Sequence, residues 1–264
     1  MVVNQVRKII DAHIHFDQYK EVERDRIISA PGVAGLISVS TDLPSAKETL
    51  ALAKRYEEVF PAIGYHPEQE LPLGGELDQL RELLDREKDN IVAIGEVGLP
   101  YYLRRENPSL DLDPYLCLLE LFMKDAARLD KPLVLHAVYE DADLVCDLLE
   151  RHSVERAHFH WFKGEEKTIR RMINNGYYIS ITPDILYKER TRALVKEYPL
   201  SLMMVETDGP WPFEGPFAGR RTEPQMLDKV IEEIARVKGL AAEVVNDRIF
   251  HNTVQFYSLD QAWF

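Results

Sequence analysis

Eight short β-like runs alternate with helix-like stretches along the 264-residue chain, and this alternation constrains the fold most strongly. Successive runs lie roughly 25 to 30 residues apart, the spacing of parallel βα units. Eight such units predict an α/β protein with a (β/α)8 (TIM) barrel, formed as a single domain over residues 1–264. The runs are 8–15, 32–40, 60–67, 91–99, 132–138, 157–162, 177–182 and 202–208.

Several signals place the helices between these runs. A capping box at 45–48, beginning with Ser45, predicts the start of the second helix. Apolar stripes within 116–126 and 169–173 predict two more helices, the latter ending at Asn175-Gly176. From residue 223 the pattern predicts two closing helices, with Thr222 and Gln225 as a cap. The aperiodic stretch 210–221 is a candidate substrate loop.

Charge and composition narrow the class of protein. The 45 acidic residues outnumber the 32 basic ones, and the net charge of −13 excludes a strong attraction of the whole surface to nucleic acid. No apolar run approaches the roughly 18 residues of a membrane span, and the N-terminal residues lack the apolar core of a signal peptide. We therefore expect a cytoplasmic protein with no membrane partner. Cys117 and Cys146 fall in helical apolar patterns and are expected to be reduced core thiols.

Polar residues gather at the ends of the predicted strands, where barrels of this type place their active sites. They are His13, His15, His66, Glu96, His136, His160 and Asp208. Imidazole and carboxylate groups suit divalent zinc, manganese, iron or nickel, and the set exceeds what one tetrahedral ion can use. Two ions that share a bridging carboxylate would use it, and such a pair can activate water for hydrolysis.

The first run, DAHIHFD at 11–17, has polar side chains at alternate positions. Strict alternation predicts that Asp11, His13 and His15 face the barrel interior, while Ile10, Ala12 and Ile14 pack outward against helices. Asp11 is expected to accept a hydrogen bond from a metal-bound histidine. The other histidines are interpreted as structural; they are His152, His158 and His251.

Seven short motifs in order resemble the TatD family of metal-dependent hydrolases and deoxyribonucleases, within the amidohydrolase-like barrels. They are DAHIHFD, GYHPE, GEVGL, KPLVLHA, HWFKG, ETDGPW and RTEP. The resemblance covers essentially the full length of the chain.

The resemblance implies a ligand set and a role for each residue. Around one metal it places four residues, which are His13, His15, Glu96 and Asp208. Glu96 would bridge to a second metal completed by His136 and His160. Asp208 would also take a proton from the attacking water, and His66 would contact the scissile phosphate or the leaving-group oxygen. The implied activity is hydrolysis of phosphodiester bonds in DNA, in the manner of a 3′–5′ exonuclease.

Two departures from the family pattern bear on substrate binding. Pro100 stands where the family commonly has Asp, and Ala137 and Val138 stand where it often has Ser-Arg. Loss of the arginine removes a phosphate partner, so a nucleolytic cleft requires a cation from another place. The candidates are Lys163, Arg220 and Arg221.

Three functions follow from these observations. The first is a two-metal phosphodiesterase with a DNA or nucleotide substrate and no obligate protein partner, whose metals could be zinc, manganese or magnesium. The second is a hydrolase of a small cyclic amide, lactone or ester, which requires a narrow pocket lined by Trp161, Tyr101 and Trp211. The third is a metal-binding barrel without catalysis that serves as an interaction module.

Overall fold

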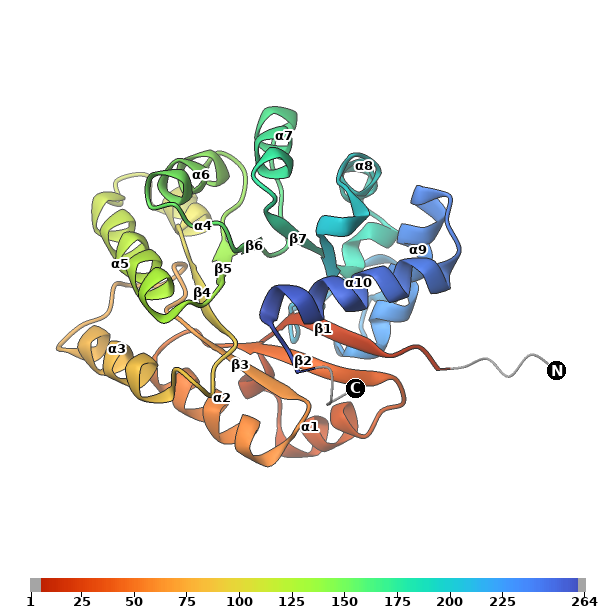
Figure 1. Cartoon of the computed structure of the whole chain (residues 1–264), viewed down its shortest axis with the longest axis horizontal. Helices are drawn as coiled ribbons and strands as arrows, with labels where there is room; N and C mark the ends of the chain where they lie inside the picture. The colour runs from red at the N-terminus through yellow and green to blue at the C-terminus, as the bar shows by residue number, and fades with distance from the viewer. Residues whose placement is uncertain (1–5, 261–264) are drawn as a thin grey trace.

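The computed structural model describes residues 6–260, in which eight parallel strands form one sheet in the order β1 to β8. Helices surround this sheet (Figure 1). The strands are β1 (Ile9–Ile14), β2 (Val33–Val39), β3 (Val59–Ile63), β4 (Ala93–Gly98), β5 (Leu133–His136), β6 (Ala157–Phe159), β7 (Tyr178–Ile181) and β8 (Met203–Val205). All eight predicted strands and the TIM barrel are confirmed; the first and last few residues of the predicted span 1–264 lie outside the described part.

The helices alternate with the strands and two more follow the last strand. Within residues 6–260 they are α1 (Glu21–Ile28), α2 (Leu43–Arg55), α3 (Glu76–Glu87), α4 (Tyr101–Glu106), α5 (Asp113–Leu129), α6 (Asp141–Arg151), α7 (Glu166–Asn174), α8 (Glu189–Glu197), α9 (Leu227–Lys238) and α10 (Ala242–Tyr257). The apolar stripes on α5 and α7 and the two closing helices are confirmed. None of the helices in this described part is long and apolar enough to cross a membrane.

Two predicted helix caps are wrong. Helix α2 begins at Leu43, two residues before Ser45, because the Asp42 side chain accepts a hydrogen bond from the Ser45 backbone N–H at 2.8 Å. Helix α9 begins at Leu227, and the Thr222 hydroxyl instead donates to the backbone carbonyl of Trp211. The start of α2 was predicted too late because Asp42 caps the helix one turn before Ser45. The cap of α9 was wrong because Thr222 makes a tertiary contact with Trp211.

The barrel closes between β1 and β8 through a short seam. The backbone N–H of Asp208 donates to the His13 carbonyl at 2.9 Å, and that of His15 donates to the Gly209 carbonyl at 2.7 Å. Below these bonds, the Asp11 carboxylate accepts hydrogen bonds from the backbone N–H and the hydroxyl of Thr207. The seam thus fixes the two histidines and Asp208 relative to one another.

The alternation predicted for the first strand is wrong over its first half. Ile10 and Ala12 belong to a cluster with Val254 and Phe256 of α10, which closes the barrel at the beginnings of the strands. Ile14 packs outward with Ile27 of α1, as predicted. The pairing of β1 with β2 shifts register between Asp11 and Ile14, and such an irregularity breaks strict alternation.

Candidate active site

The first group of converging side chains comes from the end of β1, from β4 and from the segment that follows β8. His13 Nε2 lies 3.2 Å from Glu96 Oε2 and 3.4 Å from Asp208 Oδ1. His15 Nε2 lies 3.5 Å and 3.4 Å from the same two oxygens. Four ligand atoms therefore surround one point at the ends of β1, β4 and β8.

A second group gathers around the other oxygen of the same glutamate. Glu96 Oε1 lies 3.0 Å from His136 Nδ1, 2.8 Å from His160 Nε2 and 3.3 Å from His66 Nε2. The His136 and His160 nitrogens are 3.2 Å apart. His66 thus reaches the candidate ligands themselves and also lines the pocket in front of them, where the sequence placed it.

The spacing and the lack of hydrogen bonding in the first group both fit a metal ion. Two atoms each about 2.1 Å from one tetrahedral ion lie about 3.4 Å apart, close to the four distances in that group. The carboxylate oxygen Glu96 Oε2 and both ring nitrogens of His13 are buried, yet none finds a hydrogen-bond partner among residues 6–260. Buried polar atoms without partners are rare, so these atoms are suited to bind a cation.

The electrostatics favour ligand protonation states for Glu96, His160 and Asp208, whereas Glu96 and Asp208 outweigh burial and raise the pKa of His13 well above its usual range. Burial raises the pKa of the Glu96 carboxyl, but the neighbouring His160, His66 and His13 outweigh burial and hold that pKa well below its usual range. Burial lowers the pKa of His160 to about 4, which leaves its imidazole neutral. Asp208 is also held below its ordinary pKa, because contacts with His13 and His15 outweigh its burial.

Glu68 is a functional candidate to which the sequence analysis assigned no role. Its carboxylate lies 3.1 Å from His136 Nε2, the nitrogen opposite the one that faces Glu96. The same carboxylate accepts hydrogen bonds from the backbone N–H groups of Tyr102 and Leu103 at the start of α4. Burial lowers the pKa of His136, but Glu68 and Glu96 outweigh it and raise that pKa to about 9. The sequence signal for Glu68 was its place in the motif GYHPE, two residues after His66.

Glu206 is the second residue that sequence reasoning missed. It is fully buried, and together with His13 and His160 it forms a third cluster that could hold a metal. Its carboxylate accepts a hydrogen bond from the Trp161 backbone N–H, and burial raises its pKa to about 8. Because residues two apart on a strand share a face, its position two residues before Asp208 could have revealed it.

A pocket of about 820 Å³ opens in front of the two groups, and one of the three predicted cations lines it. Lys163 projects into this pocket, whereas Arg220 and Arg221 do not line it. Arg220 lies over the Phe217 ring, and Arg221 pairs with Glu23.

Aromatic side chains form part of the pocket wall. Trp161 and Trp211 line it as predicted, with ring centroids 6.0 Å apart. Tyr101 is buried and does not line the pocket; the next residue, Tyr102, takes that place. Within the predicted substrate loop 210–221, the segment 210–212 lines the pocket.

The remaining predictions concern side chains with structural contacts. His158 is buried between the Tyr257 hydroxyl and the Ser180 hydroxyl, and His251 is exposed on α10 with Nδ1 bonded to the Asp247 carbonyl. His152 ends α6 beside Glu120.

Two predictions about side chains are wrong. Asp11 contacts no imidazole, since its described hydrogen bonds run to backbone groups and to the Thr207 hydroxyl across the seam. Cys146 is a buried free thiol as predicted, but Cys117 lies on the exposed side of α5.

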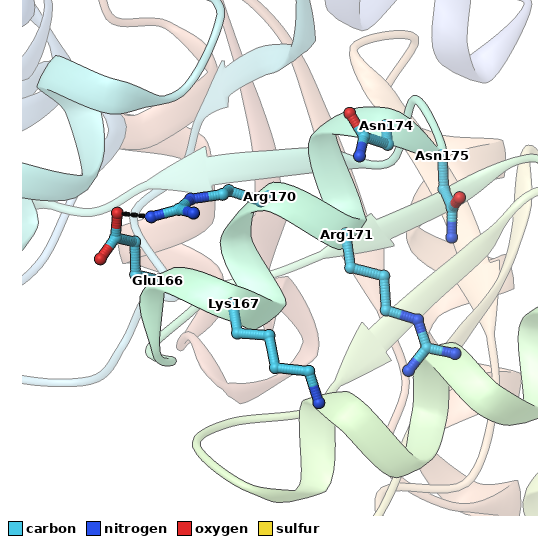
Figure 2. A pocket seen from close by; sticks show the side chains of 6 residues that line it. All are labelled: Glu166, Lys167, Arg170, Arg171, Asn174 and Asn175. Atoms are coloured by element: carbon cyan, nitrogen blue, oxygen red, sulfur yellow. Dashed lines mark hydrogen bonds and ion pairs between the residues drawn. The ribbon is translucent and has the colours of Figure 1, made fainter.

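A separate hollow of about 510 Å³ lies along the outer side of α7 (Figure 2). Its cations are already paired: Arg170 with Glu166, Lys167 with Asp143, and Arg171 with Glu150. Because these charges are neutralised within the chain, we assign this hollow no function.

Comparison with known proteins agrees with this geometry. Residues 10–258 match the family model described as TatD related DNase. The chain belongs to the TatD family. A metal-dependent hydrolase of Haemophilus influenzae is 40% identical over 95% of this chain and 100% of its own length. The human protein named deoxyribonuclease TATDN3 is 28% identical, with 94% of each chain covered.

A solved structure of a TatD relative has the same fold. The YjjV protein of Escherichia coli superposes with a TM-score of 0.86 and 26% identity, over 97% of this chain and 100% of that one. Our protein is therefore a metal-dependent hydrolase of the TatD family, and its candidate ligands lie at the strand ends where a TIM barrel carries its active site.

Proposed function

We propose that this TatD protein hydrolyses phosphodiester bonds with two divalent ions, one in each group around Glu96. The proposal rests on one observation: the two oxygens of the Glu96 carboxylate face different pairs of histidines. Oε2 faces the His13 and His15 nitrogens, and Oε1 faces those of His136 and His160. A shared carboxylate of this kind suits two ions about 3.5 to 4 Å apart.

Asp208 and His66 have separate roles in the proposed reaction. Divalent ions at these groups supply Lewis-acid stabilisation of negative charge and activation of water. Asp208 lies at the first group, where its carboxylate can take the proton of the attacking water. His66 faces the second group from the pocket, where its ring can donate a proton to the leaving-group oxygen.

DNA is the proposed source of the phosphodiester. Both the matching family model and the human relative TATDN3 carry deoxyribonuclease in their descriptions. We extend that activity to this chain, with removal of nucleotides from a strand end as the expected mode. The Lys163 ammonium in the pocket provides the cation that a phosphate substrate requires.

Hydrolysis of a generic phosphodiester tests the proposal. The protein is stripped with a chelator, reloaded with Mn²⁺ and assayed on bis(p-nitrophenyl) phosphate and on end-labelled single-stranded DNA. We expect cleavage of both by the wild type and at least a hundredfold loss in Asp208→Asn. The exposed Asp89→Asn variant is the matched control and should retain full activity. No metal-dependent cleavage, or equal cleavage by Asp208→Asn, would contradict the proposal.

A second candidate is hydrolysis of a small cyclic amide, lactone or ester. The pocket volume of about 820 Å³ favours it, since sites for small ligands span about 300 to 1,000 Å³. Val138 adds an apolar wall beside His136. A panel of such compounds, assayed with the same reloaded protein, distinguishes the two: turnover of a member without phosphodiester cleavage favours the second function.

A further inference from the structure

Lys163 occupies an unusual position for a cation in this acidic protein. Its ammonium nitrogen donates a hydrogen bond to the Tyr102 hydroxyl at 3.0 Å and lies 4.0 Å from the centroid of the Trp161 ring. Asp184, Asp208 and Glu206 act on its charge, but within residues 6–260 none of them forms an ion pair with it. The ammonium is partly buried and unpaired, so it can form an ion pair with an anionic group of a ligand.

Lys163 contacts other side chains than the candidate metal ligands do. Lys163 follows β6 and meets α4 at Tyr102, whereas the candidate metal ligands converge on Glu96. Both sets line the same pocket. Because Lys163 contacts Tyr102 and Trp161 rather than these ligands, an anion that it holds can be a different group of the substrate from the phosphodiester at Glu96.

An exposed aromatic surface lies in the same pocket. Trp211 is 57% exposed, although it lines the pocket between Pro210 and Pro212. Its ring meets Trp161 edge to face, and Trp161 carries the Lys163 ammonium on its own ring. Exposed tryptophan faces are stacking platforms for nucleic acid bases.

We propose that Lys163 and Tyr102 bind a second phosphate of the substrate while Trp211 stacks on the adjacent base. This inference rests on the proposed phosphodiesterase function and narrows its substrate to a short nucleotide or a strand end. Both parts follow from the lining of one pocket, which brings together Lys163, Tyr102 and Trp211 with the candidate metal ligands. The pocket volume suits such a ligand better than a continuous duplex.

Substrates with and without a second phosphate test the subsite. We use bis(p-nitrophenyl) phosphate, the dinucleotide TpT, 5′-phosphorylated pTpT, and TpTpT, whose additional phosphate is internal. In the wild type, the second phosphate should raise kcat/KM at least tenfold over TpT. A gain with pTpT or with TpTpT supports the subsite, and the larger gain identifies a terminal or a backbone phosphate as its ligand.

Variants of Lys163 test whether this residue causes the rise in kcat/KM that the second phosphate gives. Lys163→Met should abolish the gain that the second phosphate gives over TpT, whereas Lys163→Arg should retain most of it. Lys167→Met on α7 removes the same charge from the outer surface and is the matched control. An equal loss on all substrates, or an undiminished gain in Lys163→Met, would overturn the inference.

A binding measurement keeps this test separate from the test of catalysis. Quenching of tryptophan fluorescence is titrated with thymidine and with thymidine 5′-phosphate. The phosphate should tighten binding to the wild type at least tenfold and to Lys163→Met less than twofold, while Trp211→Ala should weaken both ligands alike. Equal affinities for the two ligands would overturn the subsite even if phosphodiesters are cleaved. Selective binding without cleavage would instead contradict the proposed function alone.

Discussion

At the residue scale, the site is a single carboxylate surrounded by imidazoles. The sequence predicted the positions of the six candidate ligands because each lies at a strand end. Glu68 and Glu206 escaped prediction, since their places two residues from His66 and Asp208 do not show that their carboxylates face His136 and His160. Such contacts depend on how separate strands meet in space.

Glu68→Gln tests the orientation of His136. Carboxylates behind a metal-bound histidine typically contribute 10–100-fold to metal affinity. The Gln side chain keeps one acceptor oxygen for the N–H groups of Tyr102 and Leu103, but it removes the charge and the second acceptor. We therefore expect one of two binding steps in a Mn²⁺ titration to weaken by about 10-fold or more, and the other to remain. The exposed Glu70→Gln should change neither step; equal titrations for all three proteins would contradict this role.

The pH dependence of phosphate binding follows from Lys163. Burial lowers the pKa of its ammonium to about 8, so the charge is present below that pH and lost above it. The charged and titratable groups around it are Arg190, Asp184, Asp208, Glu206 and Tyr102. Affinity for thymidine 5′-phosphate should fall as the pH rises from 7 to 9.5. Lys163→Arg should bind equally across that range, and a parallel fall in this variant would refute the assignment.

At the element scale, the strands were predicted more reliably than their ends. The eight runs matched because apolar residues recur with turn signals at regular intervals. The runs 157–162 and 202–208 were too long, since the chain leaves the sheet at Phe159 and Val205 to carry site residues. The register shift in β1 has no marker in the sequence, because it arises from pairing with β2.

Asp11 at the seam is the element-scale prediction for stability. Asp11→Ala leaves the buried donors of Thr207 without their acceptor, at a cost of about 1 to 3 kcal/mol. In a protein of this size the midpoint of thermal unfolding should fall by about 2 to 4 °C per kcal/mol. An unchanged midpoint in Asp11→Ala, measured by calorimetry beside Asp89→Ala, would contradict the role of the seam.

At the scale of the whole molecule, an acidic barrel carries a local cation beside its hydrolytic groups. The net charge of −13 limits long-range attraction to nucleic acid, and Lys163 is the predicted cation that reaches the pocket. The barrel itself was predictable from strand number and spacing. The shape of the pocket was not predictable, because it depends on where the segment 210–212 and Tyr102 pack.

Salt dependence tests this charge distribution. One or two phosphate contacts give a slope of about −1 for log affinity against log salt on single-stranded DNA, whereas six to ten contacts give about −4 to −7. We measure the affinity of the inactive Asp208→Asn protein for single-stranded DNA by fluorescence anisotropy and expect the shallow slope. We also expect little gain in affinity when the DNA is lengthened from three to twenty nucleotides. A steep slope together with strong length dependence would contradict recognition of a strand end.

The central claim is that Glu96 bridges two metal ions, and anomalous diffraction from crystals grown with Mn²⁺ tests it most directly. We expect two peaks about 3.5 to 4 Å apart, one beside His13, His15 and Asp208 and the other beside His136 and His160. A single peak, or a peak among His13, His160 and Glu206 with none at Glu96, would contradict it.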